Sequence, residues 1–168
     1  MNLLSAPYPR LVADIGGTNA RFAIIEAPGA APTQLRSLRC AEHNGPEAAL
    51  RAWLEDVGAQ LPDLAAFGIA TPIDGDAVAM THPPWRFSVG ELRAALDLRR
   101  LTVVNDFTAL ALSLPVLGDG DLLRVGGGEA RPGAARALIG AGTGLGVSGL
   151  LPAPGGWLPL QGEGGHVT

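Results

Sequence analysis

Residues 11–25 of the chain read LVADIGGTNARFAII. Two apolar runs that are rich in β-prone residues, 11–15 and 20–25, flank the four polar or glycine residues 16–19. Short apolar runs joined through a glycine-containing connection are typical of a β-hairpin, and four residues are too few for a helix. The sequence therefore predicts two strands joined by a glycine turn.

A second segment repeats this plan, because residues 139–151 read IGAGTGLGVSGLL. The spacing does not fit the dinucleotide-binding fingerprint G-x-G-x-x-G: counted from Gly140 or Gly142, it requires glycine where Leu145 or Val147 stands. A redox nucleotide-binding domain is therefore disfavoured. The turn either offers backbone amides to a phosphate or is a plain flexible hairpin.

Helices and short strands are expected between the two hairpins, a pattern typical of α/β domains. Periodicity, capping signals and glycine or proline breaks predict helices over 46–61, 88–98 and 108–114. They predict strands over 65–70, 77–80, 101–104, 121–125 and 136–139, with Asp74 and Gly75 turning the chain back into the second of these, and a loop over 161–168. Because glycine becomes more frequent after residue 117, we predict a small α/β domain over 1–117 and the start of a second domain over 118–168.

The composition excludes several functions. With 47% hydrophobic and 17% charged residues, most of the chain is not disordered, and 24 glycines and 14 prolines favour many short elements. All 12 basic residues are arginine, so a Walker-type phosphate loop and Schiff-base chemistry both lack their lysine. The net charge of −4 argues against a nucleic-acid partner.

The cellular setting expected from the sequence is the cytoplasm. Cys40 is the single cysteine, which excludes an internal disulfide and indicates a reducing compartment. The N-terminus lacks the basic flank of a signal peptide, and no apolar stretch is long enough to cross a membrane.

Asp14 is the first candidate for chemistry, since it interrupts an apolar run where a buried charge needs a compensating partner. Mg2+ is one such partner, because carboxylates and phosphate oxygens hold it; backbone amides of the turn are the alternative. Gly16 and Gly17 would let the backbone approach a phosphate closely, beside the hydroxyl of Thr18.

Two further pairs of polar residues are candidates. Asn105 and Asp106 follow an apolar strand, at the edge where α/β sheets bind ligands, and an aspartate there can accept a proton from a hydroxyl nucleophile. Both residue types are also preferred helix N-caps. Glu163 and His166 lie in a glycine-rich loop and are candidates to bond sugar hydroxyls; the alternative is a solvated tail.

Four motifs taken in order resemble the bacterial glucokinase family: ADIGGTNAR at 13–21, NDFTA at 105–109, GAGTGLG at 140–146 and GEGGH at 162–166. The resemblance extends from residue 11 to the last residue. It implies an actin-like (ribonuclease H-like) α/β fold with a mixed sheet and helices. It also implies ATP and Mg2+ in a cleft between two domains, glucose beside the γ-phosphate, and a homodimer.

The resemblance also implies roles for individual residues. Asp106 would be the catalytic base that takes the proton from the 6-hydroxyl of glucose, and the other sugar hydroxyls would be bound by Asn105, Glu163 and His166. Asp14 would organise Mg2+, directly or through water. The phosphates would be held by two sets of residues: Ala13, Asp14, Ile15, Gly16, Gly17 and Thr18 in the first hairpin, and Gly142, Thr143 and Gly144 in the second.

The chain departs from the family pattern in two respects. His82 stands where relatives usually carry asparagine, close to the sugar. Members of the family continue well beyond this length, so the resemblance implies an N-terminal half that ends before the second domain is complete and is poorly active alone. We therefore expect an ATP-dependent glucokinase of glycolysis; the alternative is a non-catalytic hexose-binding or regulatory remnant of the same fold.

Overall fold

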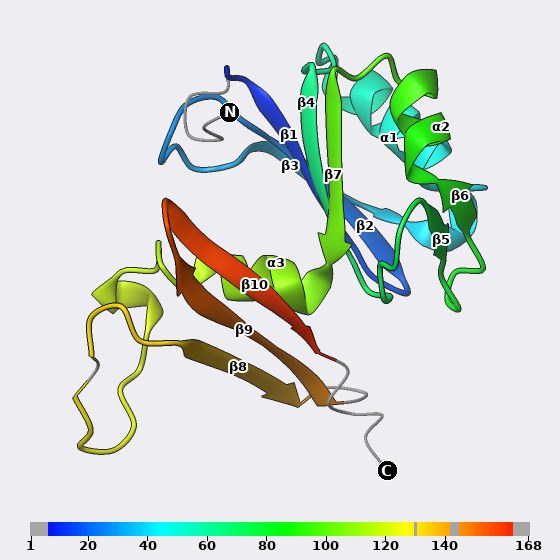
Figure 1. The fold of residues 1–168 in the computed structure, drawn as a ribbon. Coiled ribbons are helices and arrows are strands. Elements are labelled where there is room, and N and C mark those ends of the chain that lie inside the picture. The colour runs from blue at the N-terminus through cyan, green and yellow to red at the C-terminus, as the bar shows by residue number, and fades with distance from the viewer. Residues whose placement is uncertain (1–6, 130, 142–144, 163–168) are drawn as a thin grey trace. The chain divides into compact units, whose positions relative to one another are not determined.

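The computed structural model describes residues 7–129, 131–141 and 145–162. The chain divides into two compact units, Met1–Val104 and Asn105–Thr168. Each unit is described by itself below, with the element labels of Figure 1. The division of the complete protein after residue 117 stays a prediction.

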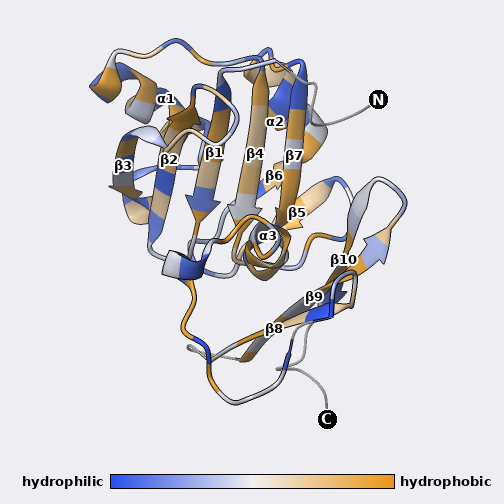
Figure 2. Cartoon of the chain, turned by 90° about the vertical axis from the view of Figure 1, so that its left-hand side faces the viewer, coloured by the Kyte–Doolittle hydropathy of each residue, from blue (hydrophilic) through white to orange (hydrophobic). Residues whose placement is uncertain are grey.

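Unit 1 is built on a five-stranded mixed sheet in the order β3-β2-β1-β4-β7. The predicted first hairpin is confirmed: β1 pairs antiparallel with β2 on one side and parallel with β4 on the other. Figure 2 shows β1, β4 and β7 running in the same direction, so their carboxyl ends share one edge of the sheet. The bounds are β1 Arg10–Ile15, β2 Asn19–Ile25, β3 Thr33–Arg39, β4 Leu64–Ile69 and β7 Arg100–Asn105.

The core of unit 1 lies between this sheet and helix α1 (Pro46–Val57). Proline at the first helical position starts the helix, and Gly58 ends it in a left-handed conformation with φ 64°. Trp53 is fully buried against Phe22, with 5.8 Å between ring centroids, and Phe22 in turn packs edge-on against Phe67. Burying each such side chain stabilises the fold by about 1.5–3 kcal/mol. Figure 1 shows α1 and α2 on the same face of the sheet.

Helix α2 (Val89–Ala95) is capped by two side chains. Ser88 takes the predicted N-cap position, where its hydroxyl accepts a hydrogen bond from the Glu91 N–H at 3.0 Å. The carboxylate of Asp76 accepts from the Ser88 hydroxyl and, at 2.8 Å, from the Gly90 N–H. These two hydrogen bonds, from Ser88 first and Gly90 second, lower the pKa of Asp76 below its ordinary value.

Unit 2 consists of helix α3 (Asp106–Ser113) and a three-stranded antiparallel sheet in the order β10-β9-β8. The helix packs against all three strands, which are β8 Arg136–Ala141, β9 Leu145–Ala153 and β10 Gly156–Gly162. Strands β8 and β9 form the second predicted hairpin, with Gly140 directly opposite Gly146.

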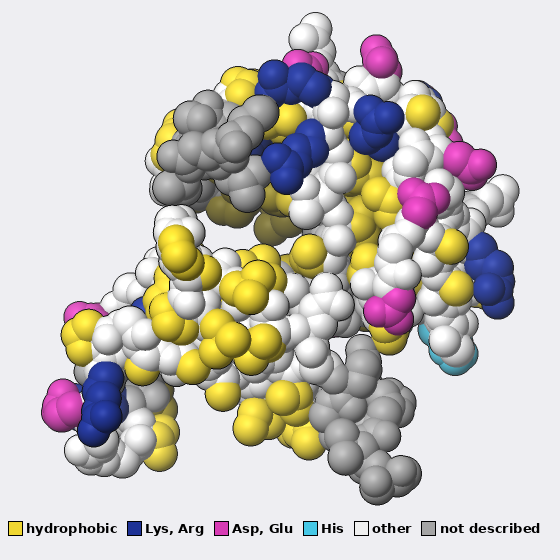
Figure 3. Space-filling model, in the orientation of Figure 1, with side chains coloured by type: hydrophobic (Ala, Val, Ile, Leu, Met, Phe, Trp, Pro, Cys, Tyr) yellow, Lys and Arg dark blue, Asp and Glu magenta, His cyan; other side chains and the backbone are white. Residues whose placement is uncertain are grey.

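Hydrophobic side chains gather on the surface of unit 2 (Figure 3). Ile139 of β8 and Leu158 and Leu160 of β10 are exposed by 69%, 56% and 45%. Among the described residues, nothing covers these side chains. No helix in the described part of the chain has the length and apolar character needed to cross a membrane.

The structure differs from the predicted local structure at several places. Strand β3 was not predicted, because it is an exposed edge strand without an apolar alternation. Strand β5 (Ala77–Ala79) pairs with β6 (Arg86–Ser88), so the chain does not turn back onto β4. Residues 121–125 form no strand, since their apolar side chains are exposed and unpaired in the described structure. Strand β10 extends through Gly162, into the segment predicted as a loop.

The cap of α2 generates a prediction about pH. The folded-state pKa of Asp76 is lowered, so the stability that its carboxylate contributes is present above the unfolded pKa, about 3.9, and is lost as the pH falls through the folded pKa. We expect Asp76→Ala to lower the thermal unfolding midpoint at pH 7, with a difference from wild type that shrinks below about pH 4. Circular dichroism melts between pH 2.5 and 7 measure this difference.

The matched control is Asp74→Ala, which removes a neighbouring exposed carboxylate outside the cap. We expect it to leave the midpoint unchanged at every pH. A difference between Asp76→Ala and wild type that stays constant across the pH range would contradict the assigned role of the carboxylate.

Candidate functional site

The turn between β1 and β2 is held mainly through its carbonyl groups. The Cys40 N–H donates to the Thr18 carbonyl at 2.9 Å, and the Cys40 Sγ lies 3.5 Å from the Gly16 carbonyl oxygen. The Gly16 N–H donates to the Asn19 carbonyl across the turn at 2.9 Å. No described residue accepts a hydrogen bond from the N–H of Gly17 or Thr18. The N–H groups of these two successive residues thus have no acceptor among the described residues, and successive unpaired N–H groups in a turn are a feature of anion-binding loops.

Gly17 also lies against the backbone of His82. A Cβ atom at position 17 would lie 3.0 Å from the His82 carbonyl oxygen, closer than side chains tolerate without a shift. The contact is made by the backbone carbonyl of His82, a residue that is itself exposed. Glycine at position 17 therefore lets the turn approach the His82 backbone this closely.

Asp14 is not buried, contrary to the premise on which the sequence selected it. Its side chain is 57% exposed and forms an ion pair with Arg21, the residue directly opposite on β2, at 2.7 Å. Because strand residues alternate between the two faces of a sheet, Asp14 lies on the face opposite to buried Ile15. The compensating cation in the described structure is thus an arginine, in an exposed pair of small energetic value.

The predicted residues Ala13, Asp14 and Ile15 lie within β1, between two paired strands. Their backbone amides therefore belong to the strand ladders of the sheet. Gly17 and Thr18 lie in the turn, outside these ladders.

Cys40 is fully buried beneath the turn. Burial raises the pKa of its thiol, because the thiolate would lose its hydration, and a backbone hydrogen bond offsets part of this effect. The thiol therefore stays protonated at neutral pH and acts as a buried contact of the turn.

At the start of α3, Asn105 and Asp106 share one hydrogen-bond network. The Asn105 Oδ1 accepts from the N–H groups of Phe107 and Thr108 at 2.9 and 3.3 Å, so the predicted N-cap role is confirmed for this residue. The Asp106 Oδ1 accepts from the Phe107 N–H at 2.8 Å and from the Asn105 Nδ2 at 3.0 Å. The amide and the carboxylate are therefore oriented together, and both side chains are half-buried.

The structure brings the predicted residues together within each unit. Asp14 and the turn residues lie in unit 1, and Asn105 and Asp106 in unit 2. The other predicted residues lie outside the described residues, namely Gly142, Thr143, Gly144, Glu163 and His166.

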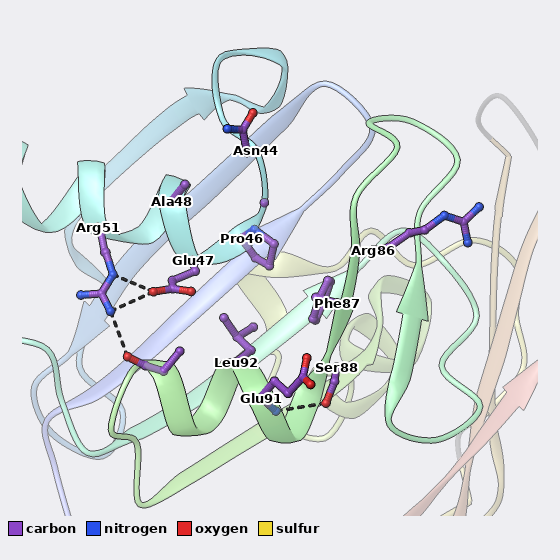
Figure 4. A pocket seen from close by; sticks show the side chains of 12 residues that line it. Asn44, Pro46, Glu47, Ala48, Arg51, Arg86, Phe87, Ser88, Glu91 and Leu92 are labelled. Carbon is purple, nitrogen blue, oxygen red and sulfur yellow. Dashed lines mark hydrogen bonds and ion pairs between the residues drawn. The ribbon is translucent and has the colours of Figure 1, made fainter.

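A cavity of about 450 Å3 lies elsewhere in unit 1, between the N-terminal ends of α1 and α2 (Figure 4). Arg51 borders it, forming an ion pair with Glu47 at 2.9 Å and donating to the Ala95 carbonyl, also at 2.9 Å. Figure 4 shows the side chain of Arg86 directed away from the other labelled residues. None of the residues that the sequence singled out for chemistry lines this cavity.

Comparison with known proteins relates the fold and these motifs to sugar kinases. The glucokinase family model matches residues 11–168. A glucokinase of Aromatoleum aromaticum is 55% identical over 165 residues, which are 98% of this chain and 50% of that protein. The crystal structure of a glucokinase from an Antarctic psychrotroph is 34% identical with a TM-score of 0.87, over 97% of this chain and 52% of that one.

A more distant structure, a ROK family glucokinase from Streptomyces griseus in complex with glucose and AMPPNP, has a TM-score of 0.59 at 18% identity. It covers 86% of this chain and 45% of that one, and it supports the fold alone. The chain thus has the actin-like kinase fold that its sequence predicts, with a mixed sheet and helices. It belongs to the glucokinase family. The chain spans about half the length of the curated relatives it matches.

The burial of Cys40 generates the prediction of this section. We expect the native protein to react with a thiol reagent such as dithionitrobenzoate at least about 100-fold more slowly than the protein unfolded in guanidinium, since reactivity requires an exposed thiolate. The absorbance of the released thionitrobenzoate measures the reaction. Complete reaction corresponds to one thiol per chain. Labelling of the native protein at the unfolded rate would contradict the packing of Cys40 under the turn.

Proposed function

We propose that the protein, in its complete form, is an ATP-dependent glucokinase that transfers the γ-phosphoryl group to the 6-hydroxyl of glucose. The observation that carries the proposal is the network at the start of α3, where one amide and one carboxylate are oriented by the same backbone N–H. Sugar recognition needs such rigid polar groups, and phosphoryl transfer needs a base beside the nucleophile. Membership of the glucokinase family supports the same substrate class.

Asp106 is the base in this proposal. Its carboxylate accepts the proton of the sugar 6-hydroxyl while that oxygen bonds to the γ-phosphorus, and the bond from phosphorus to the β-γ bridging oxygen breaks to release ADP. Two donors, the Phe107 N–H and the Asn105 Nδ2, hold Oδ1 of the same carboxylate. They fix the plane of the carboxylate before the substrate arrives. Asn105, Glu163 and His166 bind the remaining sugar hydroxyls.

The phosphates are bound by the two glycine turns. Gly17 and Thr18 offer backbone N–H groups on a turn whose carbonyls are held by Cys40. Gly142, Thr143 and Gly144 serve the phosphates from the second hairpin. Fixed backbone donors of this kind stabilise the charge that develops on the phosphoryl oxygens.

Asp14 would hold Mg2+ in this proposal. Its exposed carboxylate fits the ion, because a hard oxygen ligand reachable from solvent can bind Mg2+ directly or through water, and only one of its oxygens contacts Arg21. When bound, the ion neutralises charge on the phosphate oxygens. In this proposal the protein acts in the cytoplasm, at the entry of glucose into glycolysis.

The proposal predicts the effect of Asp106→Asn in the complete protein. Asparagine keeps an oxygen to accept the Phe107 N–H but cannot accept the hydroxyl proton, so we expect kcat to fall by roughly 10²–10⁴-fold while the KM for glucose changes little. An assay coupled to glucose-6-phosphate dehydrogenase measures both constants.

The matched control is Asp119→Asn, which changes an exposed aspartate of the same unit and should leave both constants unchanged. Glucose binding by the wild-type protein without ATP-dependent turnover would overturn the proposal in favour of a non-catalytic hexose-binding protein.

A further inference from the structure

Phe107 connects the start of α3 to the sheet of unit 2 in two ways. Its backbone N–H donates to both Asn105 Oδ1 and Asp106 Oδ1, at 2.9 and 2.8 Å. Its ring packs on strands β8 and β9 at Gly140 and Gly146. One residue thus contacts Asn105, Asp106 and the hairpin that follows them in the sequence.

The ring of Phe107 packs directly against the two glycines. They are directly opposite each other in the register of β8 and β9. A Cβ atom at Gly140 would lie 2.7 Å from the Phe107 ring, and one at Gly146 would lie 2.1 Å from it, both below any real carbon contact. An alanine at either position would therefore displace the ring or the strands.

Neither glycine is needed for backbone conformation. Their φ angles lie outside the left-handed range, and both residues occupy regular strand positions. The absence of a side chain is therefore explained by the close approach of the ring. This separates Gly140 and Gly146 from Gly142 and Gly144, which the sequence assigns to phosphate binding.

We propose that Phe107 is a positioning residue. The packing of its ring on Gly140 and Gly146 fixes the first turn of α3, and this turn fixes the position of the Asp106 carboxylate. This inference rests on the proposed function of Asp106. The ring acts at a distance from the substrate, through the helix turn whose N–H groups bind Asn105 and Asp106. Catalysis depends on such placement, because a shift of about 1 Å in a reacting group costs on the order of 10²-fold in rate.

Gly146→Ala in the complete protein tests the packing of the Phe107 ring directly. We expect kcat to fall on the order of 100-fold, because the base is displaced, while the KM for ATP stays within about threefold of wild type, since the variant changes none of the residues assigned to phosphate binding. The KM for glucose should rise, because Asn105 is held by the same Phe107 N–H as Asp106. The matched control Gly127→Ala adds a methyl group to a glycine of the same unit that has open space around it, and it should leave kcat unchanged.

Rescue distinguishes positioning from general damage to the fold. In Phe107→Leu/Gly146→Ala the smaller side chain makes room for the added methyl group, so we expect kcat to recover at least about tenfold over Gly146→Ala alone. Phe107→Leu alone, which introduces no clash, should lower kcat by about tenfold with the KM for ATP retained. It serves as the test if Gly146→Ala does not fold.

The outcomes separate this inference from the proposed function. A wild-type protein without kinase activity would refute the function. An active wild type would leave the function standing and overturn the positioning role in either of two cases: Gly146→Ala and Phe107→Leu both keep kcat within threefold, or the double variant recovers nothing.

Discussion

Close packing against glycine holds both segments that carry candidate chemistry. In unit 1, Gly17 lies against the His82 backbone while Cys40 binds the carbonyl groups of the same turn. In unit 2, Gly140 and Gly146 receive the ring of Phe107. At both contacts a side chain in place of glycine would come too close to its neighbour. Each contact holds a short polar segment that is too short to be rigid by itself. The catalytic and binding groups of the proposed kinase depend on these two contacts for their place.

The strongest local signals in the sequence predicted most of the fold correctly. Both glycine hairpins were predictable from their apolar runs, and the start of helix α1 from Pro46 and the apolar periodicity. The helix ends at Val57 and not at the predicted residue 61, because Gly58 adopts a left-handed conformation. Strand β3 was not, since its residues TQLRSLR are almost all exposed and Gln34 adopts a φ of 55°. The pairing of β5 with β6 was also hidden, because strand partners are chosen by tertiary contacts rather than by a nearby turn.

The sequence selected the candidate residues by their type and spacing, but it did not predict their local contacts. Asp14 stood out as a charge among apolar residues, yet strand alternation puts it on an exposed face beside Arg21. For Asn105 the sequence left capping and sugar binding as alternatives. The cap uses only the Oδ1 atom, so the Nδ2 group is still a donor, as its hydrogen bond to Asp106 shows, and the two roles do not exclude each other. The packing of Phe107 had no local signal, since its partners are more than thirty residues away along the chain.

The amides of the first turn provide the most direct measurement. With the complete protein labelled with 15N at glycine and threonine, saturation with a non-hydrolysable ATP analogue should shift the amide resonances of Gly17 and Thr18. The amide of Gly29, in a loop of the same unit, should stay in place. Resonances of Gly17 and Thr18 that do not move at saturation would contradict the binding of phosphate by this turn, and with it the mechanism built on the two glycine hairpins.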